Sequence, residues 1–178
     1  MNAANALTAS RIFLAPVFAW LIYTSRWQLA LLVFAIAIIT DLVDGYVARR
    51  FKQETALGKL LDPVADKVFF GVGTIVIILK SGLPPYYFLA MTRDVLIGIG
   101  GLYALAKSED RKKMEFSPSW WGKGTTAFQA LTIIAIMLQL LGFAVRAQVV
   151  DFLVLVTFML GVITVWHYLT MAIKKGYI

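Results

Sequence analysis

The sequence predicts an all-α integral membrane protein with six transmembrane helices. Of its 178 residues, 60% are hydrophobic and only 15% are charged, and the mean hydropathy is +0.79. A soluble domain has about 45–50% apolar and roughly 25% charged residues, so one globule of this size could not bury the excess. The same hydrophobicity excludes a disordered chain. None of the apolar stretches alternates with a period of two, which argues against a membrane β-barrel.

Six apolar segments approach the length of about 20 residues that a spanning helix needs. The first contains Arg11 and follows a start with no basic residue, so we expect it to be retained and not cleaved as a signal peptide. Turn-forming residues 81–85 separate the third and fourth segments, and residues 107–124 form the longest connector. The predicted spans cover residues 7–23, 27–44 (with a continuation toward residue 51), 60–79, 86–106, 125–144 and 150–173. With no repeat and no linker, we expect one membrane domain over residues 1–178.

The net charge of +7 is explained mainly by membrane topology. Eleven of the 17 basic residues fall between spans two and three, between spans four and five, or in the C-terminal tail. Only Arg26, Lys80 and Arg146 lie on the opposite side. The positive-inside rule then predicts a multi-pass protein with both termini in the cytoplasm. Attraction to anionic membrane lipid is a second effect of this charge, and no nucleic-acid partner is expected.

Four of the ten acidic residues crowd into one stretch at the cytoplasmic ends of spans two and three: Asp41, Asp44, Asp62 and Asp66. Carboxylates in a membrane span are costly, at roughly 2.5–3.5 kcal/mol each at the centre of a helix. At about 100° per residue, one face of the second helix, roughly 140° wide, carries Asp41, Asp44, Gly45, Ala48 and Arg49. The next helix carries Gly58, Asp62 and Asp66 at intervals of four residues. The spacing therefore predicts two acidic faces that meet across a helix pair.

Such a cluster requires neutralising cations. Two like charges about 4 Å apart repel by about 4 kcal/mol at an effective dielectric constant near 20. Basic side chains such as Lys59 and Lys67 could contribute, but a set of carboxylate oxygens is what Mg²⁺, Mn²⁺ or Ca²⁺ prefers. Four carboxylates suffice for two bridged ions, an arrangement that supports phosphoryl transfer.

Two simpler explanations for the carboxylates remain open at this point. Asp62 precedes Pro63 and could cap a helix, and Asp41 or Asp44 could cap a short interfacial helix. Alternatively, the four residues could line an ion or proton pathway, although transport carboxylates usually lie near the middle of the membrane.

These residues also form the pattern Asp41-x2-Asp44-Gly45-x2-Ala48-Arg49-x8-Gly58-x3-Asp62-x3-Asp66. It resembles the signature of the CDP-alcohol phosphatidyltransferase family at every fixed position and spacing. The resemblance implies a membrane enzyme that transfers a substituted phosphate from a CDP-linked donor, commonly CDP-diacylglycerol, to an alcohol and releases CMP. It also implies two divalent cations (Mg²⁺ or Mn²⁺), membership in phospholipid biosynthesis and a homodimer.

The resemblance assigns roles to individual residues. Asp41, Asp44, Asp62 and Asp66 would bind the two metal ions, and Asp66 would also be the general base for the acceptor hydroxyl. Around the CDP-linked donor, Gly45 and Ala48 would leave room for the nucleotide, Arg49 would contact phosphate and Gly58 would permit close approach. Related enzymes also line the nucleotide site with residues like those of the first span, which here are Asn5, Thr8 and Arg11. Lipid-phosphate contact is the alternative for Arg11.

Polar residues of the fourth and fifth spans are candidates for binding the acceptor. Arg93 and Asp94 could form a structural ion pair or contribute to an acceptor pocket, because a charge pair inside a span avoids lipid. The string Gly122-Lys123-x2-Thr126-x2-Gln129 resembles an element of the glycerophospholipid branch. Its spacing places Lys123, Thr126 and Gln129 on one helix face. A phosphate-bearing acceptor would explain Lys123, and interfacial anchoring is the alternative.

The identity of the acceptor is less constrained. The segments 5–16 and 122–129 resemble phosphatidylglycerophosphate synthases, which use glycerol 3-phosphate, and cardiolipin synthases, which use the lipid phosphatidylglycerol. We favour glycerol 3-phosphate, while serine and inositol phosphate remain alternatives. A bacterial or archaeal cell membrane is the expected location. A non-enzymatic ion carrier or structural subunit is the rival from another class, and it predicts no release of CMP.

Overall fold

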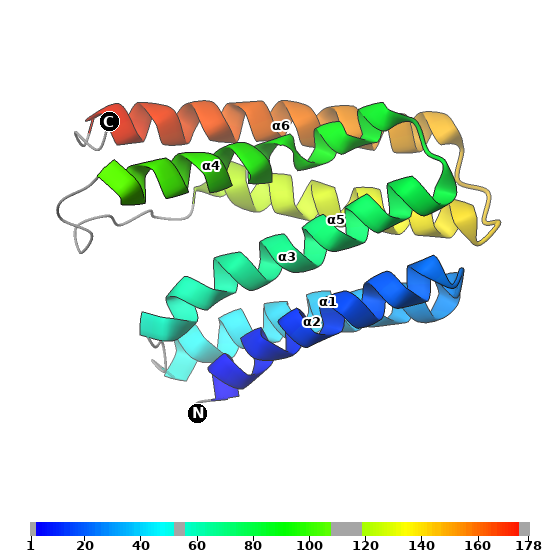
Figure 1. Cartoon of the computed structure of the whole chain (residues 1–178), viewed down its shortest axis with the longest axis horizontal. Coiled ribbons are helices and arrows are strands. Elements are labelled where there is room, and N and C mark those ends of the chain that lie inside the picture. The colour runs from blue at the N-terminus through cyan, green and yellow to red at the C-terminus, as the bar shows by residue number, and fades with distance from the viewer. Residues whose placement is uncertain (1–2, 52–55, 108–118, 175–178) are drawn as a thin grey trace. The chain divides into compact units, whose positions relative to one another are not determined.

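The computed structural model describes the backbone of residues 3–51, 56–107 and 119–174, and within them the side chains of residues 11–41, 67–100 and 119–174. Six α-helices and one 3₁₀ helix occur in these residues, with no β-strand (Figure 1). The chain divides into two compact units, residues 1–85 and 86–178. The observed helices confirm the all-helical prediction.

The first unit contains three long helices: α1 (Ala3–Tyr23), α2 (Trp27–Phe51) and α3 (Ala56–Ser81). Figure 1 shows α1 and α3 running in the same direction and α2 in the opposite one. Helix α1 packs against both of the others. Each helix contributes one fully buried phenylalanine to a mutually stacked cluster, with ring centroids 5.2–5.8 Å apart. The members of this phenylalanine cluster are Phe18, Phe34 and Phe69.

Gly73 allows α3 to approach α1 closely. A β-carbon built on Gly73 would lie 2.4 Å from Cε1 of Phe18. The Phe18 ring cannot move aside easily, because it is stacked against both Phe34 and Phe69 and has no exposed surface. A hydrogen is therefore the largest group that fits at residue 73 without rearrangement.

We expect Gly73→Ala to destabilise the first unit. Forcing extra volume into a packed core costs about 1–3 kcal/mol, so the thermal unfolding midpoint in detergent should fall. Gly98→Ala is the matched control, because a β-carbon at Gly98 meets no atom within 4 Å. Equal midpoints for the two variants would show that the contact with Phe18 does not limit packing.

The second unit contains a short 3₁₀ helix, η1 (Pro85–Met91), followed by α4 (Thr92–Lys107), α5 (Trp120–Leu140) and α6 (Ala147–Lys174). Helix α5 packs along α6, and α4 also contacts α6. Two tyrosines of η1 fasten it to the beginning of α6. The hydroxyl groups of Tyr86 and Tyr87 donate to the same oxygen, Oδ1 of Asp151, at 2.7 and 2.9 Å.

The six α-helices correspond to the six predicted spans, with differences at their ends. Helix α2 does continue to Phe51, and α3 begins before the predicted span, at Ala56. The predicted fourth span is divided into η1 and α4. Helix α5 begins at Trp120 because Ser119 caps it, with the Ser119 hydroxyl accepting a 3.0 Å hydrogen bond from the amide of Gly122.

Within the described residues, α5 and α6 are long and apolar enough to cross a membrane. Shorter apolar helical stretches cover residues 11–23 and 27–41. Length and composition of these two helices agree with the predicted membrane architecture, and the number of spans and their orientation stay predictions.

Candidate active site

An ion pair joins α1 to α2 at one end of the first unit. Nη1 of Arg11 lies 2.5 Å from Oδ1 of Asp41. The Arg11 side chain is only 5% exposed, whereas that of Asp41 is 46% exposed. The two residues are each seven positions, or two helical turns, from Phe18 and Phe34. The phenylalanine cluster thus fixes the register that brings the charges together, and one face of the carboxylate stays accessible.

The four motif carboxylates occur inside helices and not at helix ends. Asp41 and Asp44 lie within α2, at least seven residues before its end at Phe51. Asp62 and Asp66 lie within α3, which begins six residues before Asp62. The helix-capping explanation is therefore wrong for these residues, because the backbone groups that a cap would serve are already part of the helix.

Most of the predicted donor and metal residues fall outside the described side chains: Asn5, Thr8, Asp44, Gly45, Ala48, Arg49, Gly58, Asp62 and Asp66. Their predicted roles stay predictions. In the portion of the chain whose side chains are described, no three acidic or histidine residues group to hold a metal ion. Of the proposed metal ligands, that portion contains only Asp41.

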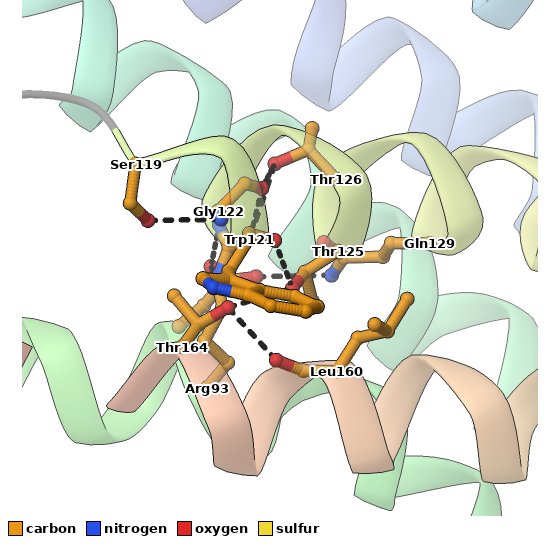
Figure 2. Close-up of polar contacts among 10 residues, drawn as sticks. Arg93, Ser119, Trp121, Gly122, Thr125, Thr126, Gln129, Leu160 and Thr164 are labelled. Atoms are coloured by element: carbon orange, nitrogen blue, oxygen red, sulfur yellow. Dashed lines mark hydrogen bonds and ion pairs between the residues drawn. The ribbon is translucent and has the colours of Figure 1, made fainter. Parts of the chain in front are cut away.

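A second polar cluster lies in the other unit, where α4 meets α5 (Figure 2). Arg93 and Asp94 are adjacent in α4, and each side chain is only 14% exposed. Their ion pair joins Nη2 of Arg93 to Oδ1 of Asp94 at 2.8 Å, and Nε of Arg93 donates to the same oxygen at 3.1 Å. The structural ion pair predicted for these residues is thus present.

Three hydrogen bonds connect this ion pair to α5. Nη1 of Arg93 donates to the carbonyl oxygen of Gly122 at 2.9 Å and to the hydroxyl oxygen of Thr126 at 3.1 Å. Nε2 of Gln129 donates to Oδ2 of Asp94 at 3.0 Å. Three of the four predicted acceptor residues, Arg93, Thr126 and Gln129, therefore belong to one network, which we call the α4–α5 network together with Asp94 and Gly122.

The fourth predicted acceptor residue, Lys123, lies next to this network but makes a different contact. Its side chain is exposed, and Nζ lies 5.2 Å from the ring centroid of Trp120. A cation over an indole ring is attracted by about 0.5–1 kcal/mol at an exposed site. Lys123 is therefore available to an anion as well as suited to interfacial anchoring.

Threonine pairs hold α5 to α6 beside the network. The hydroxyl oxygens of Thr125 and Thr164 are 3.0 Å apart, and those of Thr132 and Thr157 are 3.1 Å apart. Each hydroxyl also lies within hydrogen-bond distance of the carbonyl four residues earlier. Each pair has two hydroxyl protons for three such contacts, so at most two of the three contacts are hydrogen bonds at one time.

Sequence reasoning missed two residues that order the start of α5. Ser119 is its N-cap, and the backbone amide of Ser119 donates to the hydroxyl oxygen of Tyr168 in α6 at 3.2 Å. The serine could have been found from the general preference for serine at N-cap positions. The tyrosine could not, because 49 residues separate it from its partner.

An all-helical chain with two candidate spans is consistent with the predicted class of helical membrane proteins. Comparison with known proteins is more specific. Residues 1–173 match the CDP-alcohol phosphatidyltransferase family. The chain belongs to this family, and it is therefore a membrane-bound enzyme of the transferase class and not an ion carrier or a structural subunit.

Similar proteins include bacterial enzymes of the same size. The chain is 33% identical over 139 residues to a CDP-diacylglycerol–glycerol-3-phosphate 3-phosphatidyltransferase of Aquifex aeolicus, covering 76% of this chain and 75% of that one. An enzyme with the same name from Haemophilus influenzae is 30% identical over 180 residues, covering 96% and 91%. A CMP-forming cardiolipin synthase of Rattus norvegicus is 42% identical over 95 residues, covering 52% of this chain and only 32% of that enzyme.

Proposed function

We propose that the protein is a phosphatidylglycerophosphate synthase. It transfers the phosphatidyl group of CDP-diacylglycerol to glycerol 3-phosphate and releases CMP. The observation that carries this proposal is the similarity to enzymes named for this donor and acceptor over 76% and 96% of the chain. The cardiolipin synthase match is more identical but much shorter, so phosphatidylglycerol as acceptor is the second candidate.

Two divalent cations, Mg²⁺ or Mn²⁺, would be held by Asp41, Asp44, Asp62 and Asp66. These four side chains fit such ions, because hard divalent cations prefer carboxylate oxygens. In Asp41, Oδ1 is paired with Arg11, and the side chain is exposed enough to be reached by an ion. Helical register supports a shared site. Asp62 lies two turns before Phe69 in α3, and Arg11 and Asp41 lie at the same distance from their own phenylalanines, Phe18 and Phe34. Because the three phenylalanines stack on one another, residues two turns away at the same end should also lie at one level. When bound, the ions would offset the charge on the attacking and leaving oxygens.

The chain's own residues carry the remaining steps. The carboxylate of Asp66 accepts the proton of the acceptor hydroxyl, whose oxygen attacks the phosphorus attached to diacylglycerol. The bond from that phosphorus to the CMP oxygen breaks, and CMP leaves. Arg49 contacts the donor phosphates, while Gly45, Ala48 and Gly58 provide space for the nucleotide. Asn5, Thr8 and Arg11 line its site, with Arg11 also fixing the orientation of Asp41.

The acceptor's phosphate would be bound by Lys123, with the α4–α5 network beside it. The exposure of Lys123 and its place immediately after Gly122 support this role. Serine carries no phosphate and inositol phosphate is bulkier, and both stay among the alternative acceptors to be tested.

Further inferences concern the orientation of the chain, its domain organisation and its oligomeric state. We infer that both termini face the cytoplasm of a bacterial or archaeal cell, that residues 1–178 act as one catalytic domain, and that the enzyme is a homodimer. The excess of basic residues in the connectors on one side supports this orientation.

One assay tests the proposed acceptor. Purified protein is incubated with CDP-diacylglycerol, Mn²⁺ and, separately, glycerol 3-phosphate, phosphatidylglycerol, serine or inositol phosphate, and the lipid product is identified by mass spectrometry. We expect phosphatidylglycerophosphate and stoichiometric CMP only with glycerol 3-phosphate. Cardiolipin as the main product would instead assign the chain to the second candidate function.

A further inference from the structure

We propose that Arg93 and Asp94 act as a positioning pair for Lys123 and do not themselves bind the acceptor. This inference rests on the proposed function, because it assigns Lys123 to the phosphate of the acceptor. It concerns how the enzyme orders the start of α5, the helix on which Lys123 lies.

The hydrogen bonds of Arg93 leave little for a substrate. A guanidinium group has five N–H donors. Nε and one Nη2 donor are used on Asp94, and the two Nη1 donors are used on Gly122 and Thr126. An acceptor phosphate would have to displace these contacts, or share the one remaining donor, at side chains that are only 14% exposed.

Asp94 is equally committed to the protein. Oδ1 accepts from two nitrogens of Arg93, and Oδ2 accepts from Gln129, which is itself buried. The carboxylate thus keeps the guanidinium in one orientation and, through Gln129, attaches the whole pair to the third turn of α5. Its negative charge would also repel a phosphate that approached Arg93 directly.

Helix α6 packs against the α4–α5 network at Arg93. A β-carbon on Gly161 would lie 3.1 Å from Cβ of Arg93, so α6 passes close to the stem of this arginine. Tyr168 of the same helix holds the amide of Ser119, the N-cap of α5. The first turn of α5 is therefore fixed from α4 through Gly122 and from α6 through Ser119.

This arrangement fixes the backbone at Lys123 and leaves its side chain exposed. Lys123 follows Gly122, whose carbonyl oxygen Arg93 holds, and its amide donates to the carbonyl of Ser119 at 3.1 Å. The backbone on the N-terminal side of Lys123 is thus held by hydrogen bonds at its own amide and at the carbonyl of Gly122. The ammonium group of Lys123 stays exposed beside Trp120. A fixed backbone with an exposed cation is the arrangement expected of a residue that meets a mobile anionic substrate.

Asp94→Asn separates positioning from direct binding. Under the positioning model, the weakened hold on Arg93 loosens the first turn of α5, and KM for glycerol 3-phosphate should rise by about 10-fold or more, with KM for CDP-diacylglycerol unchanged. If Arg93 bound the phosphate itself, loss of the adjacent negative charge would leave the acceptor KM unchanged or lower it. That result would overturn the proposal.

Two further variants sharpen the test. Arg93→Lys keeps the charge but loses the planar set of donors, so under the positioning model it should raise the acceptor KM as much as Arg93→Gln does. Substantial rescue by lysine would favour direct phosphate binding and contradict the proposal. Thr126→Val removes one contact of Arg93 with little change of volume and covers the case in which the charge variants fail to fold.

Thr132→Val is the matched control, because it removes a buried hydroxyl from the same helix that bonds to Thr157 and not to the network. It should lower the unfolding midpoint but leave the acceptor KM unchanged. If Thr126→Val and Thr132→Val alter only stability, and to the same extent, the network is merely structural and the proposal fails. If the wild-type enzyme uses another phosphate-bearing acceptor, only the proposed function is overturned. The KM of each variant is then measured for that acceptor.

Discussion

Asp66→Asn is expected to abolish phosphatidyl transfer while leaving binding of CDP-diacylglycerol measurable. Asparagine has the shape of aspartate but cannot accept the proton of the acceptor hydroxyl, and loss of a general base costs about 10²–10⁴-fold in rate. Loss of one negative ligand from the proposed metal site would add to this effect. Release of CMP, followed by chromatography, gives the rate, and displacement of labelled CDP-diacylglycerol gives the donor affinity.

Asp151→Asn is the matched control for this experiment. Asp151 accepts hydrogen bonds from Tyr86 and Tyr87 through a single oxygen, and the asparagine carbonyl oxygen can accept the same two bonds. The control should therefore transfer at close to the wild-type rate. Turnover near the wild-type rate in Asp66→Asn would refute the role of Asp66 as the base.

Removal of divalent cations is expected to stop the reaction completely. Four carboxylates in one cluster repel one another by about 4 kcal/mol for each pair at 4 Å and an effective dielectric constant near 20, and the pyrophosphate of the donor adds more negative charge. Without Mg²⁺ or Mn²⁺ the donor should neither bind well nor react. The measurement is CMP release after dialysis against excess chelator, followed by return of each metal ion.

Activity should return on addition of Mg²⁺ or Mn²⁺ and should not return with monovalent salt of equal ionic strength. That control separates specific metal binding from general screening of charge. Full activity in excess chelator would refute the metal centre, and with it the proposed roles of Asp41, Asp44 and Asp62.

Features with a long hydrophobic or strictly spaced pattern could be predicted from the sequence. Six helices follow from six apolar stretches, and the family follows from carboxylates and glycines at fixed intervals in residues 41–66. Both depend on patterns within short segments, which are visible in a single sequence. The continuation of α2 to Phe51 also agrees with the sequence, because helical spacing persists through that segment.

Features that depend on distant partners could not be predicted. The fourth span is divided where Tyr86 and Tyr87 bond to Asp151, which lies 65 and 64 residues away in the sequence. Sequence spacing placed Thr126 and Gln129 on one face of α5, but could not distinguish a face that binds substrate from one that binds Arg93 and Asp94. Only the three-dimensional contacts show that these polar groups satisfy one another.

On the predicted topology, in which α2 spans the membrane, the position of Asp41 along this helix is expected to make the enzyme sensitive to the lipid around it. Asp41 is 14 residues from Trp27, so about 21 Å of helix separates them at 1.5 Å per residue. The hydrocarbon core of a bilayer is about 30 Å thick. If α2 crosses the membrane as the sequence predicts, with Trp27 at one surface, the ion pair of Asp41 and Arg11 would lie below the opposite surface. Lipids with longer acyl chains would place the Asp41 carboxylate further from water, so the reaction rate should depend on the thickness of the host membrane.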